Sequence, residues 1–529
     1  MLRRCVLAAV TLACALAVQS TPALAMHDGD VDVWSLTKLF NSQNATSAIN
    51  SDLAFWGNRA YAGNYNSLRI FDISNPAAPV LLSDFPCDGP QNDPIVWQNK
   101  LVFLAVDSVM EAPECGSARV PLNPPGLIEQ RGWEGVRILD VSNPTAPRFI
   151  KGVYTDCGAH TITLYPKSSA HLLVYVSSYP LRAGPTCGPN TGETPLHEKI
   201  SVIDVPVDHP EDARVIAQPR ISYPGDPDNQ FDPQEHGFPA ADQFGNPFNN
   251  LTACHDIGVF VDLRLAAGAC AEQVQLWRIR RSGIPDTEHP LWVFDDNVDT
   301  DGAGDPGDVA VDFWHTARFT WDGRFVQADD ESFGDGCPTV TENYLNTGQA
   351  ADTGRPHLIS TFTGQRVSHF TPARSPEEGY CSVHQGNYVR TADGYFSVNA
   401  WYEWGVDVID WSDPFDPREV AVYDVDSDNW AGYWYEGPSL PESSLTIYGS
   451  DGVEDPPTGE GFQVFRAGTD VVEGKLDHLN PQTQEGVLGF HKRKFHHRKF
   501  RTFRSAAPDA RSVAHSSAAA ARAAQRLAP

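Results

Sequence analysis

Short strands with apolar residues at alternating positions recur along the chain, and the same polar turn follows each of them. The clearest copy is Ile70–Pro79, an apolar strand that leads into Ser-Asn-Pro-Ala-Ala-Pro, and it returns as Ile138–Pro147. Weaker copies lie at Val202–Val205 and Val408–Pro414. Because proline cannot continue a strand ladder and Asn or Asp caps its own turn, the chain reverses direction at each copy. The pattern therefore predicts antiparallel strands and almost no helix.

The turn motif repeats at a nearly constant period. Its marker residues Asp72, Asp140 and Asp204 lie 68 and 64 positions apart. A supersecondary unit that returns at a constant spacing is typical of repeat architectures, and a unit made only of short strands is typical of a propeller blade. We therefore predict an all-β fold, a single seven-bladed β-propeller. Its blades lie near 51–85, 93–154, 159–223, 254–294, 314–372, 383–425 and 430–466.

The last predicted blade has only three strands, Ala431–Tyr435, Leu445–Gly449 and Gly461–Phe465. A fourth strand of suitable pattern is available at the other end of the chain, at Val31–Leu36. Pairing this N-terminal strand with the last blade would close the ring and remove its exposed edges.

The turn motif also resembles a known family. A strand rich in Ile or Val that ends in Asp-Ile/Val-Ser-Asn-Pro-x-x-Pro is similar to the LVIVD-repeat family of exported β-propeller proteins, and the resemblance covers roughly residues 30–486. The segments Asn50–Gly57 and Gly132–Arg137 look most like the large secreted actinobacterial members. The resemblance implies the fold and leaves the activity open.

The first 25 residues have the pattern of a secretory signal peptide. Arg3 and Arg4 give the positive start, Val6–Val18 the apolar core, and Ala23–Ala25 a cleavage site of small residues. The apolar stretch is too short to span a membrane, and no other segment approaches that length. We expect a secreted, extracellular protein after cleavage near Ala25, with the propeller in residues 26–486.

Export predicts disulfide bonds. Eight cysteines follow the signal peptide and fall into sequential couples, which can pair within a blade by local approach alone. The predicted bridges are Cys87–Cys115, Cys157–Cys187, Cys254–Cys270 and Cys337–Cys381. Because eight cysteines allow 105 pairings, this connectivity is a hypothesis.

The charge is divided sharply along the chain. Residues 26–490 carry a formal charge of −40, whereas residues 491–529 carry +9. The acidic body disfavours nucleic acid and anionic membrane surfaces as partners, and it suits a soluble extracellular monomer that binds cations. We interpret residues 487–529 as a disordered basic and Ala-rich tail, or alternatively as a tether to an acidic cell-wall polymer.

Four blades place a histidine at the same point of the innermost strand. They are His160, His255, His315 and His384, while Asp52 and Asp93 take this position in the first two blades. Inner strands surround the channel of a propeller, so equivalent positions face one another. Neutral imidazole suits Cu, Fe or Zn, and the four histidines are therefore a candidate transition-metal site. The alternatives are a structural role, in which each ring bonds to neighbouring backbone, and a metal-free substrate site.

Polar and aromatic residues are expected around this ring of histidines. Glu331 either orients a histidine or acts as a general base, or it lines a solvated channel rim. Trp430, Tyr433, Trp434 and Tyr435 either stack on a ligand or fill the space between blades.

A second candidate cation site lies in one loop. Oxygen-bearing side chains stand at positions 1, 3, 5, 9 and 12 of this loop, with Gly302 at position 6, which is the ligand spacing of a calcium loop. These residues are Asn297, Asp299, Asp301, Asp305 and Asp308. Pro306 and the lack of a following helical pattern argue against an EF-hand, and an acidic surface loop is the alternative.

Two function classes remain, since no nucleophile elbow, P-loop, dinucleotide fingerprint or HExxH motif occurs. One is a scaffold that binds an unknown extracellular ligand or cell-wall polymer, with or without a cation in its channel. The other is a metal-dependent oxidase or oxygenase that uses the four histidines. Carotenoid-cleaving oxygenases, whose iron is held by four histidines from propeller blades, provide a fold-level analogy without sequence resemblance. The sequence leaves open whether the protein is an enzyme.

Overall fold

The computed structural model describes residues 34–43, 48–120, 132–178, 197–224, 253–270, 273–295, 314–331, 354–372, 382–391, 394–424, 428–438, 445–452, 461–469 and 471–485. Apart from one short 3-10 turn at Pro210–Asp212, every regular element of these residues is a β-strand, which confirms the predicted all-β class. All strands belong to the unit that ends at Gln484, and Glu485–Pro529 form a second unit. Among the described residues, no helix has the length and hydropathy that a membrane span requires.

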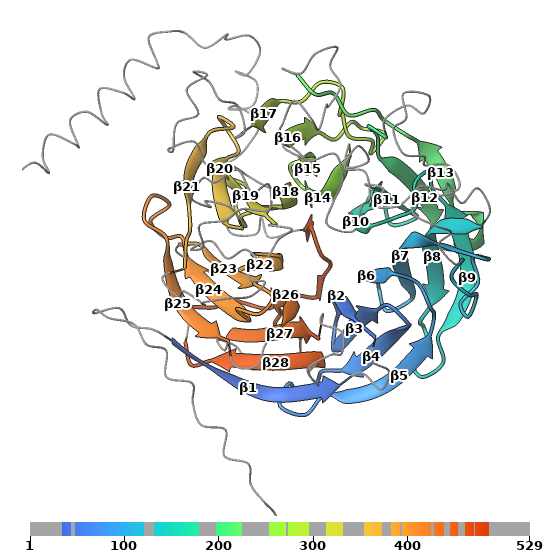
Figure 1. Ribbon diagram of the computed structural model, residues 1–529, viewed down its shortest axis with the longest axis horizontal. Helices are drawn as coiled ribbons and strands as arrows, with labels where there is room; N and C mark the ends of the chain where they lie inside the picture. The colour runs from blue at the N-terminus through green and yellow to red at the C-terminus, as the bar shows by residue number, and fades with distance from the viewer. Residues whose placement is uncertain are drawn as a thin grey trace, which may run out of the picture. The chain divides into compact units, whose positions relative to one another are not determined.

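The strands form six sheets that follow one another around a common centre (Figure 1). The first sheet contains β2 (Asn50–Trp56), β3 (Arg59–Asn64), β4 (Ser67–Asp72), β5 (Val80–Pro86) and β29 (His478–Leu479). The second contains β6 (Gln91–Trp97), β7 (Leu101–Met110), β8 (Trp133–Asp140) and β9 (Arg148–Tyr154). The third contains β10 (Thr161–Pro166), β11 (His171–Ser177), β12 (Ser201–Pro206) and β13 (Arg214–Ala217).

The remaining strands complete the fourth, fifth and sixth sheets. The fourth contains β14 (Cys254–Phe260), β15 (Leu265–Cys270), β16 (Gln273–Arg278), β17 (Trp292–Asp295) and β30 (Thr483–Gln484). The fifth contains β18 (Trp314–Phe319), β19 (Phe325–Asp330), β20 (Pro356–Ser360) and β21 (Arg366–His369). The sixth contains β22 (Gln385–Val389), β23 (Phe396–Ala400), β24 (Val406–Asp410), β25 (Arg418–Tyr423), β26 (Asn429–Trp434), β27 (Leu445–Asp451), β28 (Gly461–Ala467) and β1 (Trp34–Gln43).

The sixth sheet differs from the expected pattern of separate blades, because its eight strands close on themselves as a barrel. It consists of two antiparallel sets of four strands, β22 to β25 and β26 to β28 with β1. Two short parallel pairings join these sets: β22 pairs with β26 at Gln385 and Gly386, and β1 pairs with β25 at Trp34 and Ser35. The predicted blades at 383–425 and 430–466 are therefore both present as strand sets within one closed sheet.

The N-terminal strand takes the place predicted for it beside the last set of strands. β1 pairs antiparallel with β28 from Leu36 opposite Ala467 to Gln43 opposite Gly461. The strand extends seven residues beyond the predicted end at Leu36, and its predicted first residues, 31–33, lie outside the described residues. Leu36 is buried, so the pairing also adds apolar contact to the core.

The inner strands are apolar on both faces because each sheet lies between two others. All seven residues of β6 are buried, whereas the outermost strand β5 is mostly exposed. On β6 the adjacent residues Ile95 and Val96 point in opposite directions. Val96 packs with Leu68 of the first sheet, and Ile95 packs with Leu164 of the third. This burial on both faces explains why the inner strands read as nearly continuous apolar runs.

The polar turn that marks the repeats has the predicted chemistry in three strand sets. The Asp72 carboxylate accepts a hydrogen bond from the backbone N–H of Ser74 at 2.8 Å, and Asp140 and Asp410 bond in the same way to the N–H two residues later, at 3.0 and 2.7 Å. This side-chain bond holds the chain in a turn between the third and fourth strands of a set.

Two of the four predicted disulfide bonds lie within the described residues, and both are confirmed. Cys87 bonds to Cys115 and Cys254 bonds to Cys270. Cys157 is also disulfide-bonded. Cys187, Cys337 and Cys381 lie outside the described residues, so their pairing stays a prediction.

A segment that the sequence analysis assigned to no blade returns to the innermost strands. We call residues 471–484 the C-terminal strap. Its β29 pairs with β2 at Phe55 and Trp56, and its β30 pairs with β14 at Val259 and Phe260. Figure 1 shows the strap in red, reaching in among the inner strands. The last described part of the chain therefore links the inner strands of sheets far apart in sequence.

Removal of β1 should destabilise the fold, because it exposes the whole edge of β28 and the core beneath Leu36. We predict that deletion of residues 26–43 lowers the melting temperature or causes aggregation, measured by differential scanning fluorimetry and light scattering. Deletion of residues 26–33 alone is the control and should melt like the parent. Equal melting of both deletions would contradict this role of β1.

Mass-spectrometric peptide mapping without reduction should find Cys157 linked to Cys187 and Cys337 linked to Cys381, alongside the two bridges already seen. Local pairing is expected because the two members of each couple are close in sequence. A free thiol at any of these positions, or a bond between different couples, would overturn the scheme.

Candidate metal centre

The four predicted histidines all lie at the inner ends of the sheets. His255 belongs to β14 and His315 to β18, while His160 and His384 come directly before β10 and β22. The backbone N–H groups of these last two still bond to Ser177 and Ala400 of the neighbouring strands, so both residues extend the ladder. All four side chains are at most 2 % exposed. Regular strand pairing thus presents them at equivalent places of four sheets.

A recurring β-bulge gives a local reason for this placement. The register of the innermost strand shifts between Cys254 and Ile257 in β14 and between Trp314 and Thr316 in β18. The same shift occurs in β2, β6 and β26, at the positions of Asp52, Asp93 and Trp430. A bulge leaves a residue out of the ladder and turns its side chain in a new direction. In five strand sets, a bulge therefore turns one side chain of the innermost strand out of the ladder.

The structure brings the four imidazole rings together, although they span 225 positions of the sequence. His160 Nε2 lies 2.8 Å from His255 Nε2. The ring centroids of His255 and His315 are 3.7 Å apart, and those of His315 and His384 are 4.0 Å apart. The rings thus form one continuous cluster instead of pointing separately between the sheets.

Acceptor oxygens determine which ring nitrogen carries the proton. His160 Nδ1 lies 2.8 Å from the Asp107 carboxylate, and His384 Nδ1 lies 2.7 Å from the carbonyl oxygen of Trp430. Both oxygens can only accept, so Nδ1 must donate and Nε2 keeps its lone pair in the neutral ring. His255 Nδ1 lies 3.6 Å from the Asp256 carboxylate, which favours the same tautomer. This is the arrangement found around metal-binding histidines, whose second nitrogen donates to an oxygen acceptor.

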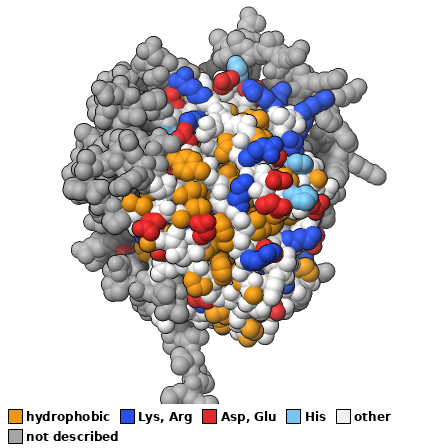
Figure 2. Space-filling view, turned by 90° about the vertical axis from the view of Figure 1, so that its right-hand side faces the viewer, with side chains coloured by type: hydrophobic (Ala, Val, Ile, Leu, Met, Phe, Trp, Pro, Cys, Tyr) orange, Lys and Arg blue, Asp and Glu red, His pale blue; other side chains and the backbone are white. Residues whose placement is uncertain are grey.

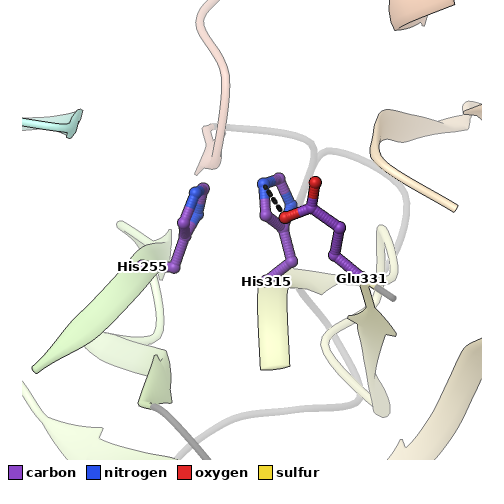
Figure 3. Close-up of side chains that lie close together, drawn as sticks. All are labelled: His255, His315 and Glu331. Carbon is purple, nitrogen blue, oxygen red and sulfur yellow. Dashed lines mark ion pairs between the residues drawn. The ribbon is translucent and has the colours of Figure 1, made fainter. Parts of the chain in front are cut away.

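Glu331 lies against the same cluster. Its carboxylate oxygens are 3.5 Å from His315 Nε2 and 3.9 Å from His384 Nε2, and one of them accepts a 2.6 Å hydrogen bond from the Tyr402 hydroxyl. Figure 3 shows His255, His315 and Glu331 directed toward a shared space. Ligand atoms of these three residues all lie within 4.8 Å of one another, close enough to hold one ion. His160 and His384 adjoin this group as the neighbours of His255 and His315.

Burial keeps His255, His315 and His384 uncharged. It lowers the pKa of His255 to about 4 and that of His384 to about 3, and it holds the pKa of His315 well below its usual value. The neighbouring rings add to the effect at all three positions, because two imidazolium charges at this spacing repel. At neutral pH these rings are therefore in the neutral form that binds metals.

Asp52 and Asp93 hold the equivalent positions in the first two sheets, as the sequence indicated. Both are buried, and burial raises the pKa of Asp52 to about 8. Burial also raises the pKa of Asp93 well above its usual range, and the neighbouring Asp52 contributes. The Tyr433 hydroxyl forms a hydrogen bond with the Asp52 carboxyl.

Several polar residues of the centre were not found from the sequence. Gln385 donates from its amide nitrogen to the Asp256 carboxylate at 2.8 Å, and its amide oxygen accepts from Gln482 of the C-terminal strap at 3.0 Å. Asp107 was missed as well. Asp256 and Gln385 each follow a candidate histidine directly, so their position gave a usable signal, whereas nothing in the local sequence connects Asp107 or Gln482 with the centre.

The aromatic residues considered as a stacking surface belong to the core. Trp430, Tyr433, Trp434 and Tyr435 are all buried in one apolar cluster with the inner strands of the first and sixth sheets. They fill the space between strand sets, and Tyr433 adds its hydroxyl to the polar network. The five predicted calcium ligands between Asn297 and Asp308 lie outside the described residues, so calcium binding stays a prediction.

The outer surface on the side of β9, β12 and β13 differs from the histidine cluster, because its described side chains are of mixed types. Figure 2 shows basic, acidic and apolar side chains interspersed on this face. Opposite charges often pair here, as Arg148 with Asp140 at 2.7 Å and His171 with Asp204 at 3.0 Å. The described residues of this face therefore present charges of both signs.

Comparison with protein families confirms the resemblance noted in the turn motif. The LVIVD repeat model matches residues 49–85, which span β2 to β5, and residues 131–155, which span β8 and β9. The chain therefore carries LVIVD repeats at these two places. A comparison with curated proteins gives no match that could suggest an activity.

The stability of the protein should depend on the ionisation of Asp52. The unfolded chain releases this proton near pH 4 and the folded protein near pH 8, so its stabilising effect is complete below about pH 4 and is lost as pH rises toward 8. Asn resembles the protonated acid. Asp52→Asn should therefore gain stability relative to the parent as pH rises from 5 to 8, with a limiting slope of about 1.4 kcal/mol per pH unit. Denaturant unfolding at several pH values measures this, and a pH-independent difference would contradict it.

Proposed function

We propose that the protein is a secreted seven-bladed β-propeller that holds a transition-metal ion through His160, His255, His315 and His384. Export is supported by the signal-like N-terminus and by the disulfide bonds, which persist in oxidising compartments. The propeller is supported by seven four-stranded sets around one centre, five as separate sheets and two in the closed sheet, with β1 completing the last set. The LVIVD matches support the same fold.

One observation carries the metal proposal. His160 Nε2 and His255 Nε2 face each other at 2.8 Å, although the acceptor at each Nδ1 favours a lone pair on both Nε2 atoms. Two lone pairs at this distance repel, and burial lowers the pKa of His255, which disfavours relief by an extra proton. A cation bound between these nitrogens removes the repulsion. Four imidazoles form a nitrogen-rich set suited to Cu, Fe or Zn.

The short nitrogen separation favours iron or copper over zinc. With metal–nitrogen bonds of about 2.0–2.1 Å, adjacent ligands lie about 3.0 Å apart at a right angle and about 3.3 Å apart in a tetrahedron. The observed 2.8 Å between His160 and His255 is nearer to the right angle. Square-planar, tetragonal and octahedral sites contain such angles, and copper and iron form them more readily than zinc does.

Glu331 and Tyr402 favour an enzyme, a metal-dependent oxidase or oxygenase. A bound copper or iron ion would supply the redox chemistry. Tyr402 fixes the Glu331 carboxylate by a 2.6 Å hydrogen bond, 3.5 Å from His315 Nε2. A carboxylate held there can accept or return a proton beside the ion, which is the role of a general base.

The second candidate is a non-catalytic scaffold that binds an extracellular ligand or a cell-wall polymer. The almost complete burial of the four histidines favours it, because a metal enclosed by protein on all sides stabilises a fold without reacting. In this case the ion, if bound, would have a structural role.

Metal analysis of the purified protein tests the proposal. We expect about one equivalent of Cu, Fe or Zn, and loss of the metal in His255→Ala. His357→Ala is the matched control, because His357 is equally buried but lies in β20, outside the cluster, and this variant should keep its metal. A protein that binds none of these ions after reconstitution would contradict the metal centre. The non-catalytic scaffold would then remain as the candidate function.

A further inference from the structure

We propose that the C-terminal strap is part of the metal centre, and that Gln482 positions His255 through Gln385 and Asp256. This inference rests on the proposed function, since it concerns how tightly and in which geometry the four histidines hold their ion. It assigns a role to a segment that lies outside the LVIVD repeats and outside the strand sets.

The strap is held firmly on both sides of Gln482. The Asn480 side chain bonds to the backbone N–H and carbonyl of Val96 in β6, at 2.7 and 2.9 Å. The Thr483 hydroxyl donates to the carbonyl of Leu164 in β10 at 2.9 Å. The carbonyl of Gln482 itself accepts from the N–H of Val259 in β14 at 2.8 Å. Three sheets thus fix the backbone from which the Gln482 side chain projects.

The backbone conformation of Gln482 indicates that this position requires a glutamine side chain. Its φ angle is +61°, in the left-handed region that glycine and asparagine enter more easily than other residues. A longer side chain at this position costs about 1 kcal/mol or more in backbone strain. The structure uses the extra length of glutamine to reach Gln385.

A chain of hydrogen bonds leads from Gln482 to the histidine cluster. Gln482 Nε2 donates to Gln385 Oε1 at 3.0 Å, and Gln385 Nε2 donates to Asp256 Oδ2 at 2.8 Å. The other oxygen of Asp256 lies 3.6 Å from His255 Nδ1. All four side chains are buried, so water does not compete freely for these partners.

The direction of each bond follows from the chemistry of the groups. Ionised Asp256 can only accept, so Gln385 must turn its amide nitrogen toward the carboxylate and its oxygen toward the strap. Gln482 must therefore present a donor. The other donor to this oxygen, the Tyr433 hydroxyl, is farther away at 3.4 Å. Without Gln482, the Gln385 amide loses its closer partner and its orientation is held less firmly.

The consequence concerns metal affinity. A carboxylate that accepts from a ligand histidine fixes the ring and its tautomer, and loss of such a partner weakens metal binding by about 10–100-fold. Gln482 does not touch Asp256 and acts on it through Gln385. The expected weakening of metal binding therefore lies at the lower end of this range, about tenfold. Gln482 is thus a positioning residue, since it acts through Gln385 and Asp256.

The test uses the full-length protein and the variant Gln482→Met, which keeps the size of the side chain and removes the donor. Gln484→Met is the matched control, because Gln484 lies two residues further along the strap, in β30, and its amide nitrogen has no hydrogen-bond partner. Copper affinity is measured by competition with a chromophoric chelator, and the geometry by the absorption and EPR spectra of the Cu²⁺ form.

We expect Gln482→Met to bind Cu²⁺ about tenfold more weakly, with shifted spectra, while Gln484→Met matches the parent. Thermal melting of the metal-free proteins checks that both variants are folded at the temperature of the titration, so that weaker binding is not caused by unfolding. If Gln482→Met does not fold, Gln482→Leu replaces it, since leucine is also apolar, fills much of the same space and has no group that can donate.

Parental affinity and spectra in a folded Gln482 variant would overturn the role of the strap and leave the metal centre intact. If the parent itself binds no metal, the proposed function fails and this inference fails with it. The two failures are therefore distinguishable.

Discussion

Four imidazole rings can share one buried space only if they are neutral and if a cation or a donor group accepts the lone pairs that face one another. The first condition is met by burial, which holds the pKa values of His255, His315 and His384 well below those of exposed histidine. The second condition depends on oxygen acceptors at Nδ1, which direct Nε2 inward at His160 and His384. A bound metal ion would complete this balance.

The fold serves this constraint by bringing distant strands to one centre. The innermost strands pack on both faces against their neighbours, and in five strand sets a β-bulge turns a side chain out of the ladder. β1 covers the edge of β28, and the C-terminal strap bonds across β2, β6, β10 and β14. Both ends of the described chain therefore hold together the sheets that carry the histidines.

Much of the fold could be predicted from the sequence, because alternating strands and Asx turns are local signals. The Asp72 and Asp140 turns, the pairing of the N-terminal strand with β28 and two disulfide bonds all follow such signals. The joining of two strand sets into one closed sheet was not predictable, since it depends on two parallel pairings of two residues each.

The candidate site was predictable in part, for a similar reason. Repetition at equivalent positions revealed the histidines, and the structure places them in one cluster. Asp107 and Gln482 lack any local motif and reach the cluster only through tertiary contacts, so only the three-dimensional arrangement shows them. The aromatic residues near Trp430 were ambiguous in the sequence, because burial and ligand stacking require the same side chains.

The central claim is that the four histidines hold one metal ion together. X-ray absorption spectroscopy at the metal edge of the purified or reconstituted protein tests it most directly. The account predicts a first shell of nitrogen at about 2.0–2.1 Å with the multiple-scattering pattern of several imidazoles, lost in a variant without His255 and His315. A first shell of sulfur, or of oxygen without imidazole scattering, would contradict it.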